Sequence, residues 1–185
     1  MQEQLTPDFG DYELLDTGDF EKLERFGRYV TRRPEPQAIW RRSLAEEEWR
    51  RTADASFRRD ARSDERGEWR LAPGMPDRWV VEYAYKRMRL RMRLGLTSFK
   101  HVGIFPEQAA NWDYAMAKIR AAGRPVSVLN LFGYTGAATV ACASAGASVC
   151  HVDAARGMVA WGKENAAASG VADRPIRWIV DDCGK

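Results

Sequence analysis

Three short segments in the second half of the chain carry residue types suited to a nucleotide-like ligand. The loop Asn130-Leu131-Phe132-Gly133-Tyr134-Thr135-Gly136 follows an apolar run, and its glycines allow a sharp turn and a close backbone approach to a ligand. Asp153 lies 20 residues beyond Gly133, where a carboxylate can accept hydrogen bonds from ribose hydroxyls. Asp181 and Asp182 follow a third apolar run, and Asp182 can accept a bond from an adenine amino group.

These segments predict a parallel sheet that alternates with helices. The apolar runs 126–131, 148–152 and 176–180 indicate strands, and helices are expected over 137–145 and 156–169. Continuous apolar strands separated by helices are typical of a parallel sheet covered on both faces, with its ligand at the carboxyl ends of the strands. Upstream, an amphipathic helix is expected over 106–122 because Pro106 suits a first helical position.

The first part of the chain has a different character. Residues 21–100 hold 21 Lys/Arg against 13 Asp/Glu, whereas residues 1–20 hold six acids and no base. Short apolar segments separated by Pro- and Gly-containing turns predict a small β-rich domain over 1–98, followed by the α/β part over 99–185. The arginine excess indicates a phosphate-bearing partner, with RNA as the candidate.

An alternating segment over 79–94 is predicted to be one strand. Its apolar face consists of Met88, Leu90, Met92 and Leu94. Its opposite face carries Arg87, Arg89, Arg91 and Arg93 and is expected to continue through Tyr83 and Tyr85. Such a face could stack bases and meet phosphates, or it could be an ordinary solvated sheet face.

Several function classes are disfavoured by the sequence. Cys142, Cys150 and Cys183 are odd in number and without close pairing, so neither a disulfide framework nor a metal site is expected. The chain start has no secretory pattern and no apolar run is long enough to cross a bilayer, which leads us to expect a cytoplasmic protein without membrane contact.

The segment from Val128 to Gly136 resembles the first motif of class I S-adenosylmethionine-dependent methyltransferases, in the branch of ribosomal-RNA large-subunit cytosine-C5 methyltransferases. The segments around Asp153 and Asp182 are similar to the ribose and adenine motifs of that family, and 99–108 is similar to a segment that packs over the cofactor. The resemblance implies S-adenosylmethionine as cofactor and ribosomal RNA as substrate. It also implies cofactor contacts from Asn130, Phe132, Gly133, Tyr134, Thr135, Gly136, Asp153, Asp181, Asp182, Pro106 and Gln108.

The resemblance further implies a Rossmann-like sheet of which only the first three strands are present, so that the chain is an N-terminal fragment. Catalytic residues stay unassigned, because the substrate loop and the nucleophilic cysteine of the family are expected beyond Lys185. Asn165, Trp161 and Trp178 are expected to be packing residues. The sequence leaves the oligomeric state open.

Other functions remain open at this point. The chain could be an RNA-binding module with a vestigial α/β part, or a methyltransferase for a protein or a small molecule. A nucleotide-dependent oxidoreductase is a further alternative. It is disfavoured because Thr135 and Ala138 stand where the dinucleotide fingerprint GxGxxG needs glycine.

Overall fold

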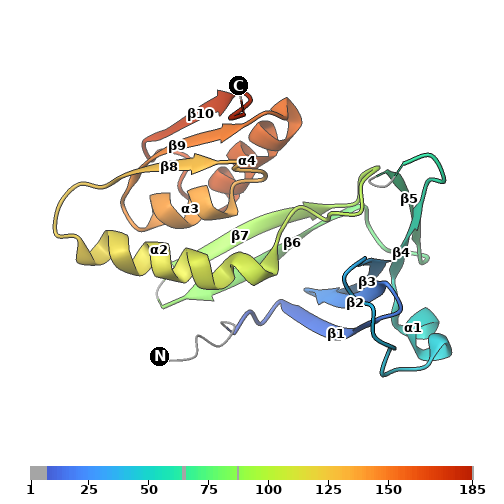
Figure 1. Cartoon of the computed structure of the whole chain (residues 1–185). Helices are drawn as coiled ribbons and strands as arrows, with labels where there is room; N and C mark the ends of the chain where they lie inside the picture. The colour runs from blue at the N-terminus through green and yellow to red at the C-terminus, as the bar shows by residue number, and fades with distance from the viewer. Residues whose placement is uncertain (1–7, 64–65, 87, 185) are drawn as a thin grey trace. The chain divides into compact units, whose positions relative to one another are not determined.

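The structure is a computed structural model that describes residues 8–63, 66–86 and 88–184. The chain divides into two compact units. Unit 1 comprises Met1–Phe9, Glu82–Arg93 and Gly103–Lys185, and unit 2 comprises Gly10–Val81 and Leu94–Val102. Figure 1 labels the elements along the chain, and each unit is described by itself below. No helix in the described part of the chain is both long and apolar enough to cross a membrane.

Unit 2 contains a five-stranded sheet in the order β1-β2-β3-β4-β5. The strands pair antiparallel except for β3 and β4, which run parallel and are connected by a segment containing the short helix α1. The bounds of these elements are β1 Tyr12–Gly18, β2 Glu21–Phe26, β3 Tyr29–Pro34, α1 Glu46–Thr52, β4 Ala55–Arg59 and β5 Gly67–Leu71.

The core of unit 2 forms around Trp49 of α1. Its ring is fully buried against Leu23 and Val30, and its indole N–H donates to Asp16 at 2.8 Å. Asp16 also accepts from the backbone N–H groups of Ser43 and Leu44, so a single carboxylate holds the loop and the helix on the sheet. These hydrogen bonds outweigh the effect of burial and lower the pKa of Asp16.

The segment predicted as one strand over 79–94 is two strands, so that prediction was wrong. β6 (Arg78–Tyr85) and β7 (Met88–Gly95) pair with each other, and Lys86 between them has a left-handed φ of 52°. The apolar alternation of β7 is confirmed, because Met88, Leu90, Met92 and Leu94 are buried. Alternation alone could not show the reversal, since each strand keeps its own period of two.

Tyr83 does not belong to an outward face, in contrast to the prediction. Its ring is 1% exposed, packs against Phe9 and Trp112, and its hydroxyl donates to Asp113 at 2.8 Å. Burial and this carboxylate raise the pKa of Tyr83. The aromatic residue therefore contributes to the interior of unit 1 and is unavailable for stacking on a base.

Unit 1 contains a parallel sheet in the order β10-β9-β8 with intervening helices. The predicted order of elements is confirmed, and each predicted end lies within one or two residues of the observed one. The bounds are η1 Pro106–Gln108, α2 Ala109–Ala121, β8 Ser127–Leu131, α3 Ala137–Ser144, β9 Ser148–Asp153, α4 Arg156–Ala168 and β10 Ile176–Val180.

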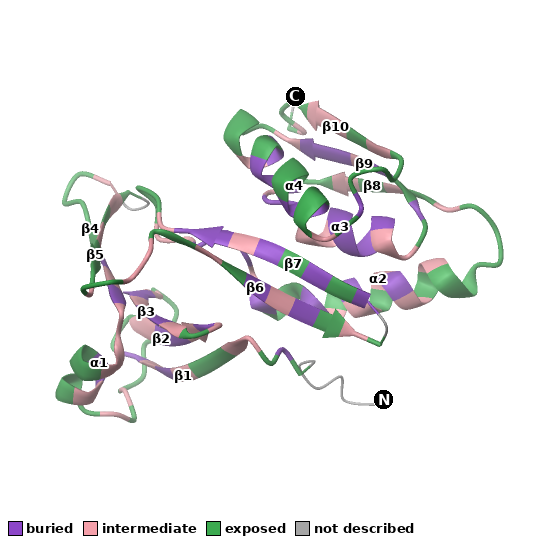
Figure 2. Cartoon of the chain, turned by 180° about the vertical axis from the view of Figure 1, so that it is seen from behind, coloured by how far each residue is buried: buried purple, intermediate pink, exposed green. Residues whose placement is uncertain are grey.

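Helices α3 and α4 both cover the same face of this sheet, as Figures 1 and 2 show. The register places Asn130, His151 and Trp178 in one row on that face. Thr139 of α3 bonds the first two, and Gly162 of α4 lies against the ring of Trp178. The opposite face is uncovered in the described residues, where Leu129 is 63% exposed, as is expected if only the first part of a sheet covered on both faces is present.

Candidate functional site

The loop between β8 and α3 has an unusual backbone. Phe132, Tyr134 and Gly136 have φ values of 54°, 50° and 86°, which lie in the left-handed region. Each non-glycine residue in this region costs about 1–2 kcal/mol, so contacts from the rest of the fold must hold the loop in place. The Gly133 N–H donates to the Val152 carbonyl and the Gly136 N–H to the Gly133 carbonyl, both at 2.9 Å.

Gly133 is glycine because the ring of His151 lies directly beneath it. A Cβ at this position would come within 2.3 Å of His151 Cε1 and 2.5 Å of its Nδ1. The ring itself is fully buried, packs on Trp178 and pairs through Nδ1 with the Thr139 hydroxyl at 2.9 Å. Burial lowers the pKa of His151, and the charge of Asp153 offsets this in part. The imidazole is therefore neutral at neutral pH.

Two polar side chains fix the second half of the loop. Thr135 is 1% exposed, and its hydroxyl donates to the Gly103 carbonyl at 2.5 Å. Asn165 of α4 donates to the Thr135 carbonyl and accepts from the Arg93 N–H, both at 2.8 Å. Asn165 was expected to be a packing residue, and it is fully buried. Its amide also connects the loop to β7, and only the complete fold brings these partners together.

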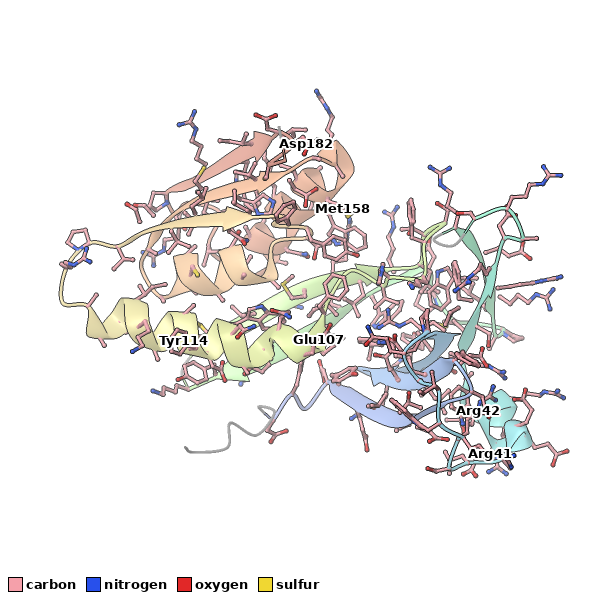
Figure 3. The ribbon with its side chains drawn as sticks, in the orientation of Figure 1. Arg41, Arg42, Glu107, Tyr114, Met158 and Asp182 are labelled. Atoms are coloured by element: carbon pink, nitrogen blue, oxygen red, sulfur yellow. The ribbon has the colours of Figure 1, made fainter. Side chains whose placement is uncertain are left out.

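A pocket of about 380 Å³ opens beside the loop, between η1, the start of α2 and the start of α3. The loop side is formed by residues 130–135 together with Ala137 and Ala138. The first N–H groups of α3 have no partner inside the helix and carry its positive dipole end, so this wall suits an anion such as a carboxylate. The opposite wall includes Glu107, Gln108 and Asn111. Figure 3 labels Glu107 where η1 leads into α2.

The pocket thus offers two kinds of polar group to a ligand. Glu107 supplies a carboxylate, and Asn111 donates to the Gln108 side-chain carbonyl at 2.8 Å, which orients both amides. Phe105 and Tyr134 also line the pocket, and their rings contact each other with centroids 5.2 Å apart. A zwitterionic amino-acid group would meet donors on one wall and a carboxylate on the other.

The strand-end acids lie at the same edge of the sheet as the loop. Asp153 accepts from the Tyr134 N–H with one oxygen and from the Ala155 N–H with the other, at 2.8 and 2.9 Å. Asp181 accepts from the Asp182 N–H, and Asp182 from the Gly184 N–H. Each carboxylate oxygen of Asp153 can accept a second hydrogen bond, from a ligand. Asp153 therefore both braces the loop and offers acceptors beside it.

The predicted cofactor residues fall into three groups. Asn130, Phe132, Gly133, Tyr134, Thr135 and Gln108 line the pocket. Pro106 and Gly136 are buried and shape the backbone, while Asp153, Asp181 and Asp182 lie outside the pocket lining at the strand ends. Glu107 and Asn111 were missed, although their positions one and five residues after Pro106 place them on the first turns of the predicted helix.

The arginine face of β7 is engaged with carboxylates. Arg89 and Arg91 pair with Glu82 at 3.7 and 3.1 Å, and Arg93 pairs with Glu164. Arg87 lies outside the described residues. No group of three or more His, Cys, Asp or Glu that could hold a metal ion is found in the described ranges.

Comparison with known proteins relates this architecture to one family. The family model described as S-adenosylmethionine-dependent methyltransferase matches residues 28–178. A crystal structure of a SAM-dependent methyltransferase from Agrobacterium tumefaciens is similar with a TM-score of 0.84 and 40% identity, over 94% of this chain and 53% of that one.

Curated relatives match a shorter part of the chain. A ribosomal RNA large subunit methyltransferase K/L from Shewanella baltica is 35% identical over 94 residues, which is 50% of this chain and 13% of the relative. The protein of the same name from Shewanella frigidimarina is 32% identical over 108 residues, or 58% of this chain and 15% of the relative. The chain thus corresponds to a small part of these relatives.

Proposed function

This chain belongs to the family of S-adenosylmethionine-dependent methyltransferases, whose cofactor is S-adenosylmethionine, and we propose from that premise that it provides the cofactor site for methylation of RNA, at cytosine C5 of ribosomal RNA. We further propose that unit 1 is the Rossmann-like part of a class I methyltransferase fold and that the β-rich unit is its RNA-binding part. The observation that carries the proposal is the loop 132–136. Its residues Phe132, Tyr134 and Gly136 have left-handed φ values, and the loop lies beside a polar pocket.

The residues of the site fit S-adenosylmethionine in charge and position. The free N–H groups at the start of α3 would receive the carboxylate of its methionine part, and Glu107 would face the ammonium group. Asp153 would accept from the ribose hydroxyls, and Asp181 and Asp182 from the adenine side. When bound, the cofactor supplies an activated methyl group on a sulfonium, so the protein's task is to hold and orient the reactants.

The proposed acceptor rests on the relatives, and the cysteines of this chain add no support to it. The curated relatives are named as ribosomal RNA methyltransferases. A C5-cytosine reaction uses a cysteine thiolate that attacks the base. Cys142 cannot serve, because burial within α3 raises the pKa of its thiol to about 11 and keeps it protonated at neutral pH. None of the cysteines of the chain is assigned a catalytic role.

Equilibrium titration of the chain with S-adenosylhomocysteine and, separately, with NAD tests the cofactor proposal. We expect binding of the former only. Asp153→Asn should weaken binding by roughly tenfold to a hundredfold, because a charge-assisted hydrogen bond contributes about 1.5–3 kcal/mol. The control Asp173→Asn changes the same charge at an exposed position without a described side-chain bond and should have no effect.

Binding of NAD in place of S-adenosylhomocysteine would reject the proposal. The acceptor is tested by single-turnover transfer from radiolabelled S-adenosylmethionine to ribosomal RNA, to total protein and to small-molecule pools. Label recovered as 5-methylcytosine supports the assignment, whereas label confined to protein or to small molecules would replace RNA by that class of acceptor.

A further inference from the structure

A second hollow lies in unit 2, at the end of the β4–β5 hairpin, and it plays no part in the cofactor site. It encloses about 480 Å³ and is lined by Arg58, Arg59 and Arg66 together with Ser98, against the two acids Asp60 and Glu68. We call this feature the β4–β5 hollow. Its lining combines guanidinium groups with a hydroxyl, which is a donor set suited to phosphate oxygens.

The backbone around the hollow is held rigidly. Gly67 permits the closest contact, because a Cβ there would lie 2.1 Å from the Arg58 carbonyl oxygen. The Gly67 N–H donates to the Ser98 carbonyl at 2.9 Å, and the Trp69 indole N–H donates to the Phe99 carbonyl at 3.0 Å. These bonds fix the segment that carries Ser98 and Phe99 against β5. The backbone that carries Ser98 and Phe99 is therefore already held in place before a ligand binds, which lowers the cost of ordering this segment on binding.

Three exposed arginines in or next to the hollow form no ion pair within the described ranges, which exclude residues 64 and 65. Arg58 and Arg66 line the hollow, and Arg70 lies on β5 two residues beyond the lining residue Glu68. The register places Arg58 and Arg70 on the same face of the hairpin, two residues apart across the strands. The guanidinium of Arg66 lies over the Phe99 ring at 5.5 Å. Of the two acids, Asp60 already accepts a bond from the Arg62 N–H.

Other arginines of unit 2 behave differently. Arg32 and Arg42 each bond both Glu21 and Glu46. The bonds to Glu46, of which that from Arg32 has the largest effect, lower the pKa of Glu46 to about 2. Arg33 pairs with the buried Glu24 at 2.6 Å. The fold thus neutralises Arg32, Arg33 and Arg42 within the unit, whereas Arg58 and Arg66 of the hollow form no ion pair among the described residues and can meet an external anion.

We propose that the β4–β5 hollow binds the phosphate backbone of the RNA substrate and that Phe99, whose ring is 39% exposed, stacks an adjacent unpaired base. The choice of RNA as the polyanion rests on the proposed function. The arginine row of β7 is a weaker candidate, because Arg89, Arg91 and Arg93 already face Glu82 and Glu164. In the hollow, Asp60 and Glu68 lie among the lining residues, but Arg58 and Arg66 form no ion pair with them in the part of the chain that the structure describes.

The test compares two triple variants of the full chain that remove equal charge. One is Arg58→Gln/Arg66→Gln/Arg70→Gln, and the control is Arg28→Gln/Arg41→Gln/Arg51→Gln, at exposed arginines of the same unit. Binding of a fluorescent single-stranded ribosomal RNA fragment is followed by anisotropy over a series of KCl concentrations. The first variant should lower the slope of log affinity against log salt by about 2, since each phosphate contact on a single strand contributes about 0.7.

The control variant should change the slope by much less, and Phe99→Leu should weaken binding about tenfold with an unchanged slope. Equal loss in both triple variants would overturn the inference, because the effect would then be one of net charge. So would competition by an acidic peptide as strong as that by RNA, which would indicate a protein partner. Circular dichroism establishes that each variant is folded.

Titration with S-adenosylhomocysteine separates this inference from the proposed function. We expect both triple variants to bind it as the parent chain does. If the chain binds S-adenosylhomocysteine and RNA binding does not depend on the hollow, the inference fails alone. If RNA binding depends on the hollow but S-adenosylhomocysteine is not bound, the inference about the hollow is supported and the proposed cofactor site is rejected.

Discussion

The contact between Gly133 and His151 leads to a sharp prediction for the variant Gly133→Ala. The added Cβ would meet three ring atoms at 2.3, 2.5 and 2.8 Å, whereas ordinary contacts of such carbons begin at 3.4 Å. The ring has no open side into which to move, because Thr139 bonds it and Trp178 packs on it. The loop or the ring must therefore shift by roughly 1 Å, and overpacking of this kind costs about 1–3 kcal/mol.

A shift of this size is larger than a binding site tolerates, since productive geometry requires placement within about 0.5 Å. We expect Gly133→Ala to weaken S-adenosylhomocysteine binding by at least about tenfold and to lower the free energy of unfolding by about 1–3 kcal/mol. Isothermal titration calorimetry and denaturant unfolding measure the two effects. Gly157→Ala is the matched control, because nothing lies within 4 Å of its added Cβ and its position in α4 favours alanine.

A double variant tests the cause. If the ring of His151 is the obstacle, His151→Ala should restore part of the stability lost in Gly133→Ala, with a coupling of about 1 kcal/mol or more. Additive losses in the double variant would show that the clash is not the mechanism. Affinity for S-adenosylhomocysteine within twofold of the parent chain in Gly133→Ala would refute the role of this loop in cofactor binding altogether.

Three further predictions concern the support of the site. Asn165→Leu should lower the free energy of unfolding by about 2–4 kcal/mol, because it leaves the Thr135 carbonyl and the Arg93 N–H without partners. Denaturant unfolding measures this loss, with Lys163→Leu on the exposed side of α4 as the control. Because burial lowers the pKa of His151, the unfolded chain binds the proton first on acidification. Stability should thus fall as the pH drops below about 6.5 and level off below the folded pKa, and a slope unchanged in His151→Asn would contradict this. Glu107→Gln should weaken S-adenosylhomocysteine about tenfold but leave affinity for the deaminated analogue, which lacks the ammonium group, unchanged.

The elements of unit 1 could be predicted from sequence because their signals are local. Apolar runs of strand length, glycines after helices and Pro106 at a helix start each act within a few residues. The same holds for the left-handed loop, where glycine indicates a sharp turn. The prediction failed at Lys86, where a non-glycine residue adopts a positive φ and reverses the chain inside an unbroken alternation. No local pattern marks such a residue, since the paired strands impose its conformation.

Contacts between distant residues were the second limit. Asn165 lies 30 residues from Thr135 and 72 from Arg93, and neither partner is specified by the sequence around it. His151 shows the opposite case. Its fixed ring explains a glycine that the sequence had already identified, but the reason for that glycine became visible only when β9 was placed beneath the loop.

The arginines show what a charge pattern in the sequence can predict and what it cannot. Alternation identifies which side chains share a face, and it correctly separated the buried and the charged sides of β7. It does not identify what lies opposite that face, and Glu82 and Glu164 occupy it. The arginines of the β4–β5 hollow form no regular pattern, because Arg58 and Arg59 come from β4 and Arg66 comes from the segment before β5. Arg58 and Arg66 form no ion pair among the described residues, and this geometry of partners, rather than a periodic pattern, is the basis on which the hollow is proposed as an RNA surface.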